Sequence, residues 1–276
     1  MENKIRQILG KESYNVYDLA VIVEILRGEN GCPWDRVQTH QSIRNDFLEE
    51  VYEVLEAIDM DSDEMLREEL GDVLLQVVFH AQIESEQKNY NLDDIANDIC
   101  KKLIIRHPHV FGDVNADNVD TVLKNWDSIK KETKGQESYT DTLKSVPKMF
   151  PALMRAQKLG KRASRAGMDF RGKDDCFESL KSEVLELEEA LNNGDTKSAE
   201  EELGDLLFSC ANMARKMGVD AEQLLYNSSD KFLRRFEAVE NAVRQDGLDM
   251  ATLSIDALDI YWAKIKPNIE SSDSKK

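Results

Sequence analysis

The sequence predicts an all-α protein built from two tandem helical domains. Only five of the 276 residues are proline, and the long stretches of Leu, Glu, Lys and Ala favour helices. The alternation of apolar and polar residues that marks strands is hard to find. An internal repeat, about one domain in length, divides the chain into two related halves. We therefore expect helices throughout.

The charge balance limits the classes of partner. The chain has 36 basic and 54 acidic residues, a formal net charge of −18. Such a surface repels a phosphate backbone, so we expect no stable binding to nucleic acid. A small anionic ligand remains compatible with this charge if a metal ion screens the carboxylates.

Several features predict a cytoplasmic protein with no membrane association. No apolar run approaches about 18 residues, the length that spans a membrane. The N-terminal MENKIRQILG is too polar for a signal peptide. The four cysteines are far apart and form no CxxC motif, which suits a reducing compartment and buried apolar roles.

The repeat relates the two halves by a shift of 133 residues. EELGDVLL at 68–75 matches EELGDLLF at 201–208, and the register holds without a gap from Glu50 through Leu74. Further on, the register slips by a few residues. Lys102-x3-Arg106 then resembles Lys231-x3-Arg235, and WDSIK at 126–130 resembles WAKIK at 262–266.

The halves divide in a polar stretch with one glycine, TKGQESY at 133–139. We therefore expect an N-terminal domain at 1–135 and a C-terminal domain at 136–276. The C-terminal domain is expected to end in a disordered tail from about residue 268.

Spacing predicts that four acids converge in the first copy. Glu50 and Glu53 share one face of a helix, and so do Glu69 and Asp72 on the next helix. Residues 50 and 72 average to 61, as do 53 and 69. A chain that folds back at Asp61 therefore places Glu50 opposite Asp72 and Glu53 opposite Glu69.

The same construction places the turn of the second copy at Gly194, within NNGDTKS. The four converging acids there are Glu183, Glu186, Glu202 and Asp205. They flank an apolar stripe with helical spacing, made of Leu180, Val184, Leu187 and Leu191. The glycines between the acids, Gly71 and Gly204, leave room for another backbone or a ligand to approach.

Converging acids indicate a bound cation. An acidic run on a helix is usually a solvated face, but four facing carboxylates repel one another, so a chain that builds this cluster twice is expected to hold a metal ion. Oxygen ligands suit Mg²⁺, or Mn²⁺ as a substitute. No histidine completes a Glu-x-x-His motif, which argues against a di-iron centre. His107-Pro-His109 could bind metal, although packing at a helix end is the favoured interpretation.

Carboxylate-held Mg²⁺ typically binds substrate phosphates. Lys231 and Arg235 are four residues apart on one helical face and could form a phosphate clamp, with ordinary surface charge as the alternative. Trp262 could stack on a base, although tryptophan more often belongs to a core.

These motifs carry a family resemblance. Glu49-Glu50-x-x-Glu53 followed by Glu69-x-x-Asp72 resembles the EExxE…ExxD signature of all-α nucleoside triphosphate pyrophosphohydrolases, and the likeness is closest to the MazG family. The motifs of the first domain are NGCPWD (30–35), QTH (38–40), EELGDVLLQVVFHAQI (68–83) and RHPHVFGD (106–113). Those of the second are PALMRAQKLGKRA (151–163) and DKFLRRF (230–236).

The resemblance covers nearly the whole chain and implies tandem all-α domains that form four-helix-bundle-type assemblies as a homodimer. It implies Mg²⁺-dependent hydrolysis of nucleoside triphosphates, including deoxy forms and many bases, to monophosphate and pyrophosphate, to cleanse or regulate the nucleotide pool. The family's activity is usually credited to the second domain. On this chain the resemblance makes Glu183, Glu186, Glu202 and Asp205 metal ligands, Lys231 and Arg235 phosphate contacts, and Trp262 a neighbour of the nucleotide.

One departure leaves the working half open. Ser182 stands where the second copy should have the first Glu of EExxE, whereas the first copy keeps Glu49 with Glu50, Glu53, Glu69 and Asp72. If the leading acid orients water, the first site is the active one, with Glu49 as a candidate general base. Two other functions remain open: a pyrophosphatase restricted to pyrimidines, and a nucleotide-binding regulator without turnover.

Overall fold

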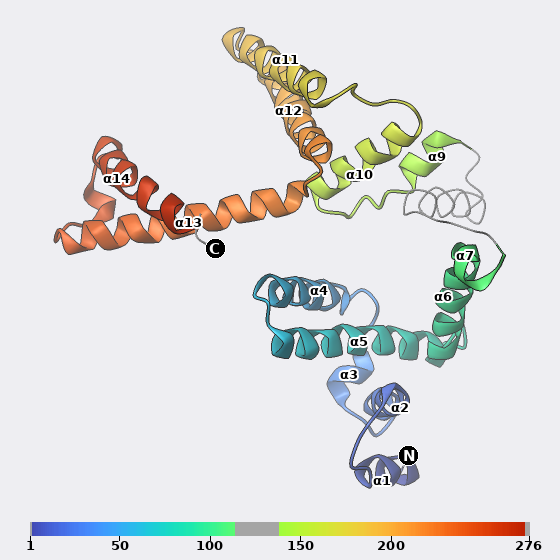
Figure 1. The fold of residues 1–276 in the computed structure, drawn as a ribbon. Coiled ribbons are helices and arrows are strands. Elements are labelled where there is room, and N and C mark those ends of the chain that lie inside the picture. The colour runs from blue at the N-terminus through green and yellow to red at the C-terminus, as the bar shows by residue number, and fades with distance from the viewer. Residues whose placement is uncertain (1, 114–137, 274–276) are drawn as a thin grey trace. The chain divides into compact units, whose positions relative to one another are not determined.

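The computed structural model describes residues 2–113 and 138–273, with side chains as far as residue 266. Every regular element in these ranges is helical, which confirms the all-α prediction (Figure 1). None of the described helices is long and apolar enough to cross a membrane. The WDSIK segment and most of TKGQESY lie outside the described residues.

The chain forms two compact units, Met1–Lys130 and Lys131–Lys276. The helices described in the first unit are α1 (Glu2–Leu9), α2 (Val16–Arg27), α3 (Pro33–Val37), α4 (Arg44–Asp59), α5 (Asp63–Glu86), α6 (Leu92–Arg106) and α7 (Pro108–Phe111). Those of the second are α9 (Tyr139–Lys144), α10 (Ala152–Arg165), α11 (Lys173–Asn192), α12 (Thr196–Met217), α13 (Ala221–Gln245), the 3₁₀ turn η1 (Met250–Thr252) and α14 (Ile255–Asp273).

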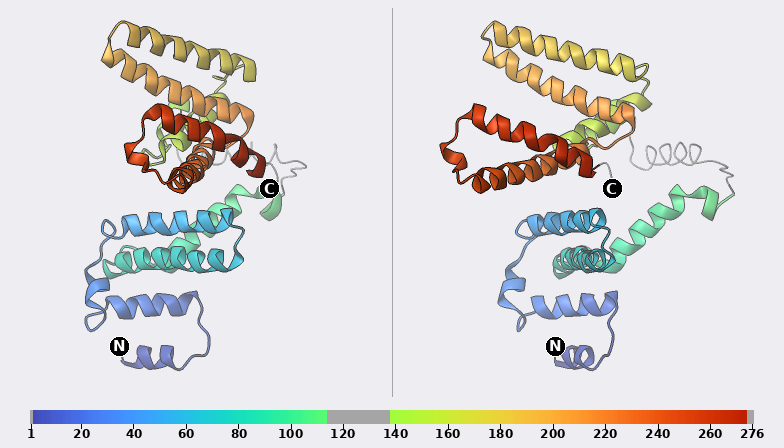
Figure 2. Two further views of the ribbon diagram at one scale, coloured as in Figure 1. Left: turned by 90° about the vertical axis from the view of Figure 1, so that its left-hand side faces the viewer. Right: turned by 60° about the vertical axis from the view of Figure 1, so that its left-hand side comes forward.

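A helix hairpin dominates each unit. Helices α4 and α5 lie side by side in the first unit, as α11 and α12 do in the second (Figure 2). The turns fall where the sequence places them. Asp61 has φ 52° and Gly194 has φ 68°, so both predicted midpoints adopt the left-handed conformation that reverses a helix. Ser62 then caps α5 by accepting a hydrogen bond from the Met65 amide, and Asp195 caps α12 through the Ser198 amide.

The cores of the two units differ in character. In the first, α2 packs across α5, with the residue before α4, through branched and aromatic side chains: Val23, Ile43, Val78, Phe79 and Ile83. In the second, α10 packs on α12 and the start of α13 through alanines: Ala156, Ala211, Ala214 and Ala221. Small side chains let these helices approach closely.

Arg27 fixes the connection between α2 and α4. Its side chain is buried and donates two hydrogen bonds of 2.8 Å to the Glu86 carboxylate at the end of α5. Its Nη1 also donates to the backbone oxygens of Asp35 and Gln38, at 2.7 and 3.1 Å. One guanidinium thus joins three segments and satisfies two carbonyl groups of the NGCPWD-QTH region.

The stripe of Leu180, Val184, Leu187 and Leu191 is not buried in the single chain: Val184 is 44% exposed and Leu191 is 63% exposed. The hairpin consists of two helices, so each helix can bury only the face that meets the other helix. The buried residues of α11 are Cys176 and Ala190. At the C-terminus, α14 continues through Asp273, so the residues expected to be disordered from 268 to 273 are helical.

Candidate functional site

The first hairpin gathers acids from both of its helices. Glu50 of α4 and Glu69 and Asp72 of α5 each present a carboxylate oxygen, and the three oxygens lie within 4.8 Å of one another. All three residues are half-buried. Glu53 of α4 lies close enough for its charge to raise the pKa values of both Glu50 and Glu69. Glu49 is exposed on α4 and lies outside this group.

Burial and mutual repulsion raise the pKa values in this cluster. The pKa of Glu50 is raised by burial and then by the charge of Asp72. The pKa of Glu69 is raised by burial and then by the charge of Glu53. The strongest repulsion therefore acts between the facing pairs that the fold-back at Asp61 predicts.

The second hairpin repeats the arrangement with Glu183 and Glu186 of α11 and Glu202 of α12, whose carboxylate oxygens also lie within 4.8 Å of one another. Burial raises the pKa of Glu202, and the charges of Glu186, Asp205 and Glu183 raise it further, in that order. Asp205 is exposed and outside the group of three, but its charge reaches Glu202.

Serine hydroxyls support the second cluster. Ser182 Oγ donates a hydrogen bond of 2.8 Å to Glu186 Oε1, and the buried Ser209 Oγ approaches Glu183 Oε1 at 3.5 Å. Ser182 is the residue that replaces the first Glu of the EExxE motif. Two carboxylates of the second cluster, those of Glu186 and Glu183, therefore have neutral hydroxyl groups beside them.

The donor set of both clusters fits a hard divalent cation. Within residues 2–113 and 138–266, these are the two groups of three or more metal-ligating side chains, and every ligand is a carboxylate oxygen. Oxygen-only sets favour Mg²⁺, Ca²⁺ or Mn²⁺ over zinc. A cation would also remove the repulsion that raises the pKa values.

The basic and aromatic candidates lie on a different helix pair. The Arg235 guanidinium is 6.0 Å from the centre of the Trp262 ring, and the Phe232 ring is 5.5 Å from it. Helix α13 extends away from the α11–α12 hairpin and packs along α14 (Figure 1). The contacts given for Arg235 and Trp262 are with each other and with Phe232, and their approach to an acidic cluster stays a prediction.

The two glycines of the repeat border open space. A Cβ atom added to Gly71 or Gly204 would meet nothing within 4 Å among the described residues. The close approach predicted at these glycines is therefore not made by the chain's own described residues, and it stays a prediction for a ligand or a second subunit.

A histidine network was not anticipated from the sequence. His40 Nδ1 is 2.6 Å from His80 Nδ1 on α5, and His40 Nε2 is 2.6 Å from Glu84 Oε1. Burial, and then the His40 charge, lowers the pKa of His80. His80 and Glu84 are one helical turn apart, and His80 lies two turns beyond Asp72. That i, i+4 spacing was the available signal, but nothing in it shows that His40 is the partner.

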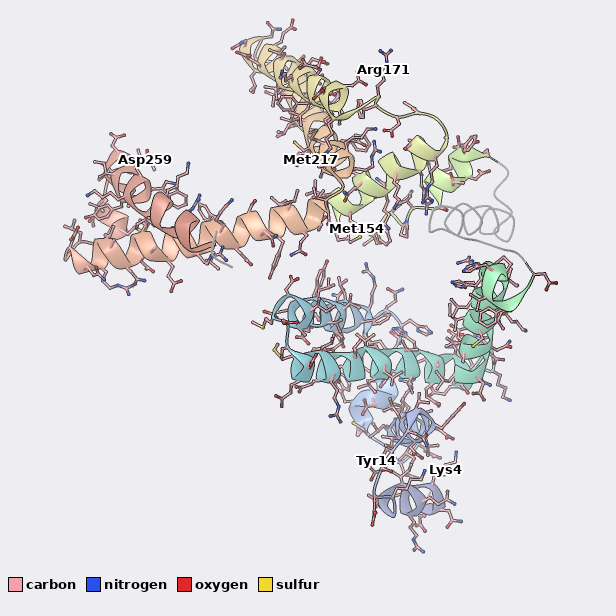
Figure 3. The ribbon with its side chains drawn as sticks, in the orientation of Figure 1. Lys4, Tyr14, Met154, Arg171, Met217 and Asp259 are labelled. Atoms are coloured by element: carbon pink, nitrogen blue, oxygen red, sulfur yellow. The ribbon has the colours of Figure 1, made fainter. Side chains whose placement is uncertain are left out.

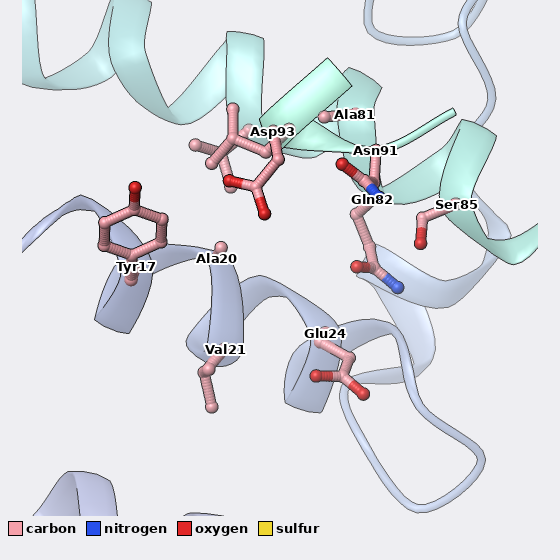
Figure 4. A pocket seen from close by; sticks show the side chains of 11 residues that line it. Tyr17, Ala20, Val21, Glu24, Ala81, Gln82, Ser85, Asn91 and Asp93 are labelled. Atoms are coloured by element: carbon pink, nitrogen blue, oxygen red, sulfur yellow. The ribbon is translucent and has the colours of Figure 1, made fainter. Parts of the chain in front are cut away.

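The first unit also has a hollow that is separate from the cluster of Glu50, Glu69 and Asp72. Helices α2 and α5 and the start of α6 surround it, with Tyr17 and Glu24 on one side and Gln82 on the other (Figure 4). Glu24 forms an ion pair of 2.6 Å with Lys4. With Glu24 and Asp93 among its lining, this hollow disfavours phosphate.

Both acidic clusters lie in segments that match a known protein family. The model of the MazG nucleotide pyrophosphohydrolase domain matches residues 38–111 and 172–239, the two segments that contain the acidic hairpins. The nucleoside triphosphate pyrophosphohydrolase/pyrophosphatase MazG of Thermotoga maritima is 42% identical over 92% of this chain and 96% of its own length. The nucleoside triphosphate pyrophosphohydrolase of Escherichia coli K12 is 42% identical over 90% of this chain and 95% of its own.

Both domain matches contain a complete set of four register-related acids. The two relatives are similar over nearly their full lengths, so the tandem arrangement is shared as well as the motif. The chain belongs to the MazG family of nucleotide pyrophosphohydrolases.

Proposed function

We propose that the protein hydrolyses nucleoside triphosphates, including deoxy forms with a broad range of bases, to a nucleoside monophosphate and pyrophosphate. Mg²⁺ is the proposed cofactor, with Mn²⁺ as a substitute. The observation that carries the proposal is the acidic cluster in each hairpin, with three carboxylate oxygens within 4.8 Å, in a chain of a pyrophosphohydrolase family. The activity for which the two bacterial relatives are named supports it.

The proposed metal ligands in the main catalytic half are Glu183, Glu186, Glu202 and Asp205. When bound, Mg²⁺ lowers the pKa of a water molecule and neutralises charge on the phosphates. Ser182 and Ser209 keep Glu186 and Glu183 in place through their hydroxyl groups. A carboxylate of the cluster that is not engaged by metal accepts the proton of the attacking water.

Lys231 and Arg235 are proposed to stabilise the pyrophosphate leaving group, and Trp262 to lie near the nucleotide. Because α13 leads away from the hairpin, these groups reach a cluster most simply in a homodimer, from the second subunit. The exposed apolar side chains on the hairpin, such as Leu203, Leu207 and Phe208, favour its coverage by another subunit in a four-helix arrangement.

The N-terminal copy, with Glu49, Glu50, Glu53, Glu69 and Asp72, is proposed as a second metal site. We further propose a domain boundary near residue 135 and a cytoplasmic role in cleansing or regulating the nucleotide pool. The four cysteines are free in the structure, which suits a reducing compartment.

Product analysis tests this function. Purified protein is incubated with ATP, dTTP and dUTP, with Mg²⁺ or with EDTA, and the products are separated by ion-exchange chromatography. We expect monophosphate and pyrophosphate, and only with the metal. Glu202→Gln and Glu69→Gln each remove one ligand from one half, so the variant that loses activity identifies the working half.

Glu188→Gln and Glu64→Gln are matched controls on the same hairpins, because both glutamates are exposed and lie outside the clusters. Turnover of pyrimidine nucleotides alone would replace the broad substrate range with a narrow one. Saturable nucleotide binding without turnover on a wider nucleotide panel would overturn the enzymatic proposal and leave a regulator.

A further inference from the structure

A basic hollow lies at the junction of α10, α12 and α13, away from the acidic cluster. Its volume is about 470 Å³. Helix α10 lines one side with Gln157, Lys158 and Lys161, and Arg215 and the α12–α13 turn line the other. Met154 on α10, one of the lining residues, is labelled in Figure 3.

The walls of this hollow are held in place by hydrogen bonds. Gln157 Nε2 donates to the Val219 carbonyl at 2.5 Å, and Gln157 Oε1 accepts from the Ala221 amide at 3.1 Å. The Glu222 carboxylate accepts from the Met154 amide at 3.1 Å. One helix therefore clamps the turn between the next two, so the site is formed before any ligand arrives.

Arg215 is a fixed cation in this wall. Its side chain is 13% exposed, and its Nη2 donates to Asp169 at 2.7 Å. Its Nε donates to Asn212 Oδ1 at 3.1 Å. The Asp169 carboxylate also pairs with Lys216 at 2.9 Å. Its single negative charge offsets only one of the two positive charges, so Arg215 and Lys216 together with Asp169 keep a net charge of about +1.

Lys158 and Lys161 are the ligand-facing candidates. They lie three residues apart on one face of α10, both are exposed, and neither forms an ion pair with a described residue. The acid in the lining, Asp220, caps α13 through the Gln223 amide. Helix α10 carries five basic residues and no acid, in a chain with a net charge of −18, so this is a local reversal of the surface charge.

We propose that this hollow binds a small phosphate-bearing anion at a site separate from the metal-binding carboxylates. Arg215 is ten residues beyond Asp205 on α12, which puts about 15 Å of helix between the two sites. Lysines bind phosphate as point charges, and a guanidinium adds directed donors. The chemistry suits a di- or triphosphate group, either as free pyrophosphate or as the phosphate chain of a nucleotide.

Calorimetric titration in EDTA tests the site. Without metal, the acidic clusters repel phosphates, so the part of pyrophosphate binding that is lost when Lys158 and Lys161 are replaced reports the basic hollow. We expect saturable binding to the wild-type protein and at least a tenfold loss of affinity in Lys158→Glu/Lys161→Glu. A second variant, Lys158→Gln/Lys161→Gln, should weaken binding in the same direction with less risk to folding. Titrations with ATP and with AMP, each in the presence of pyrophosphate, distinguish the two sources of phosphate. If ATP competes with pyrophosphate, the hollow accepts the phosphate chain of a nucleotide, and AMP, which lacks that chain, should compete less. If ATP does not compete, the ligand is free pyrophosphate.

The matched control is Lys144→Glu/Lys148→Glu, which makes the same charge change at exposed lysines of the same unit that do not line the hollow. Absence of pyrophosphate binding by wild-type protein, or equal weakening in the control, would overturn the proposal. The readout needs neither metal nor turnover, so its outcome is independent of the proposed reaction.

Discussion

Single carboxyl groups determine how the acidic hairpins respond to pH. The pKa values of Glu50, Glu69 and Glu202 are raised above 4.5 by burial and by neighbouring acids. In the pH range just above 4.5 the unfolded chain is therefore ionised at these positions while the folded chain still holds protons. The contribution of these groups to stability falls as pH rises through that range.

Glu202→Gln tests this repulsion. The variant removes one repelled charge, so its melting temperature in EDTA at pH 7 should exceed that of the wild type, and the difference should shrink at pH 4. Mg²⁺ should raise the wild-type melting temperature more than that of the variant, because a ligand is lost. Differential scanning fluorimetry measures both effects, with Glu188→Gln as the control. A lower melting temperature of the variant in EDTA would contradict the prediction.

Asp169 has the opposite electrostatic character. Hydrogen bonds from Arg215, Lys216 and Ser164 hold its pKa far below 3.8. A depressed pKa contributes stability above 3.8 that is lost as pH falls through the folded-state value.

We expect Asp169→Asn to lower the free energy of unfolding by about 2 kcal/mol at pH 7, because two cations lose their shared partner. The loss should diminish below pH 3.8. Urea denaturation at pH 7 and pH 3 measures it, and Asp174→Asn, at an exposed position, is the control. An equal loss at both pH values would show that Asp169 acts by packing alone.

At the scale of helices, replacement by alanine should change the stability of the protein in opposite directions at two glycines, Gly160 and Gly204. A Cβ at Gly160 would lie 2.3 Å from Asn212 Oδ1 and 3.0 Å from Arg215 Nε, both in buried or half-buried side chains. A Cβ at Gly204 meets nothing within 4 Å of the described chain.

We therefore expect Gly160→Ala to destabilise the protein by about 1–3 kcal/mol through overpacking between α10 and α12. Gly204→Ala should stabilise the isolated chain by up to about 1 kcal/mol, the helix preference of alanine over glycine. Chemical denaturation compares the two. If Gly204→Ala instead abolishes turnover or assembly, a ligand or a second subunit occupies the space beside this glycine.

The hairpins could be predicted from sequence because each depends on local signals. The turn positions at Asp61 and Gly194 follow from symmetry within the acidic motif, and the facing acids follow from helical spacing. The Asp169–Arg215 and Arg27–Glu86 contacts could not be predicted, because they join residues that are 46 and 59 positions apart with no repeating pattern. The direction of α13 was also missed, since nothing in its sequence fixes the angle at the α12–α13 turn.

At the scale of the whole molecule, exposed apolar surface predicts assembly. Leu185, Leu203, Leu207 and Phe208 on the second hairpin are each more than 40% exposed. Two helices cannot bury both of their faces, so we expect a homodimer that covers this surface.

Sedimentation velocity should show a dimer at micromolar concentration, and Leu207→Asp should shift the protein towards monomer. Activity should fall in parallel if the second subunit supplies Lys231 and Arg235 to the cluster. Glu200→Asp, at a position lining the turn end of the same hairpin, is a mild control. A fully active Leu207→Asp monomer would show that each chain completes its own site.

The buried Arg27 also sets an order of events during synthesis. Its carboxylate partner, Glu86, is 59 residues further along the chain, and ribosomes add about 5–20 residues per second. For about 3–12 s after Arg27 is added, the guanidinium has no Glu86 to bind. The NGCPWD-QTH region, in which Arg27 binds the carbonyl groups of Asp35 and Gln38, therefore reaches its final position only after the end of α5 has been made.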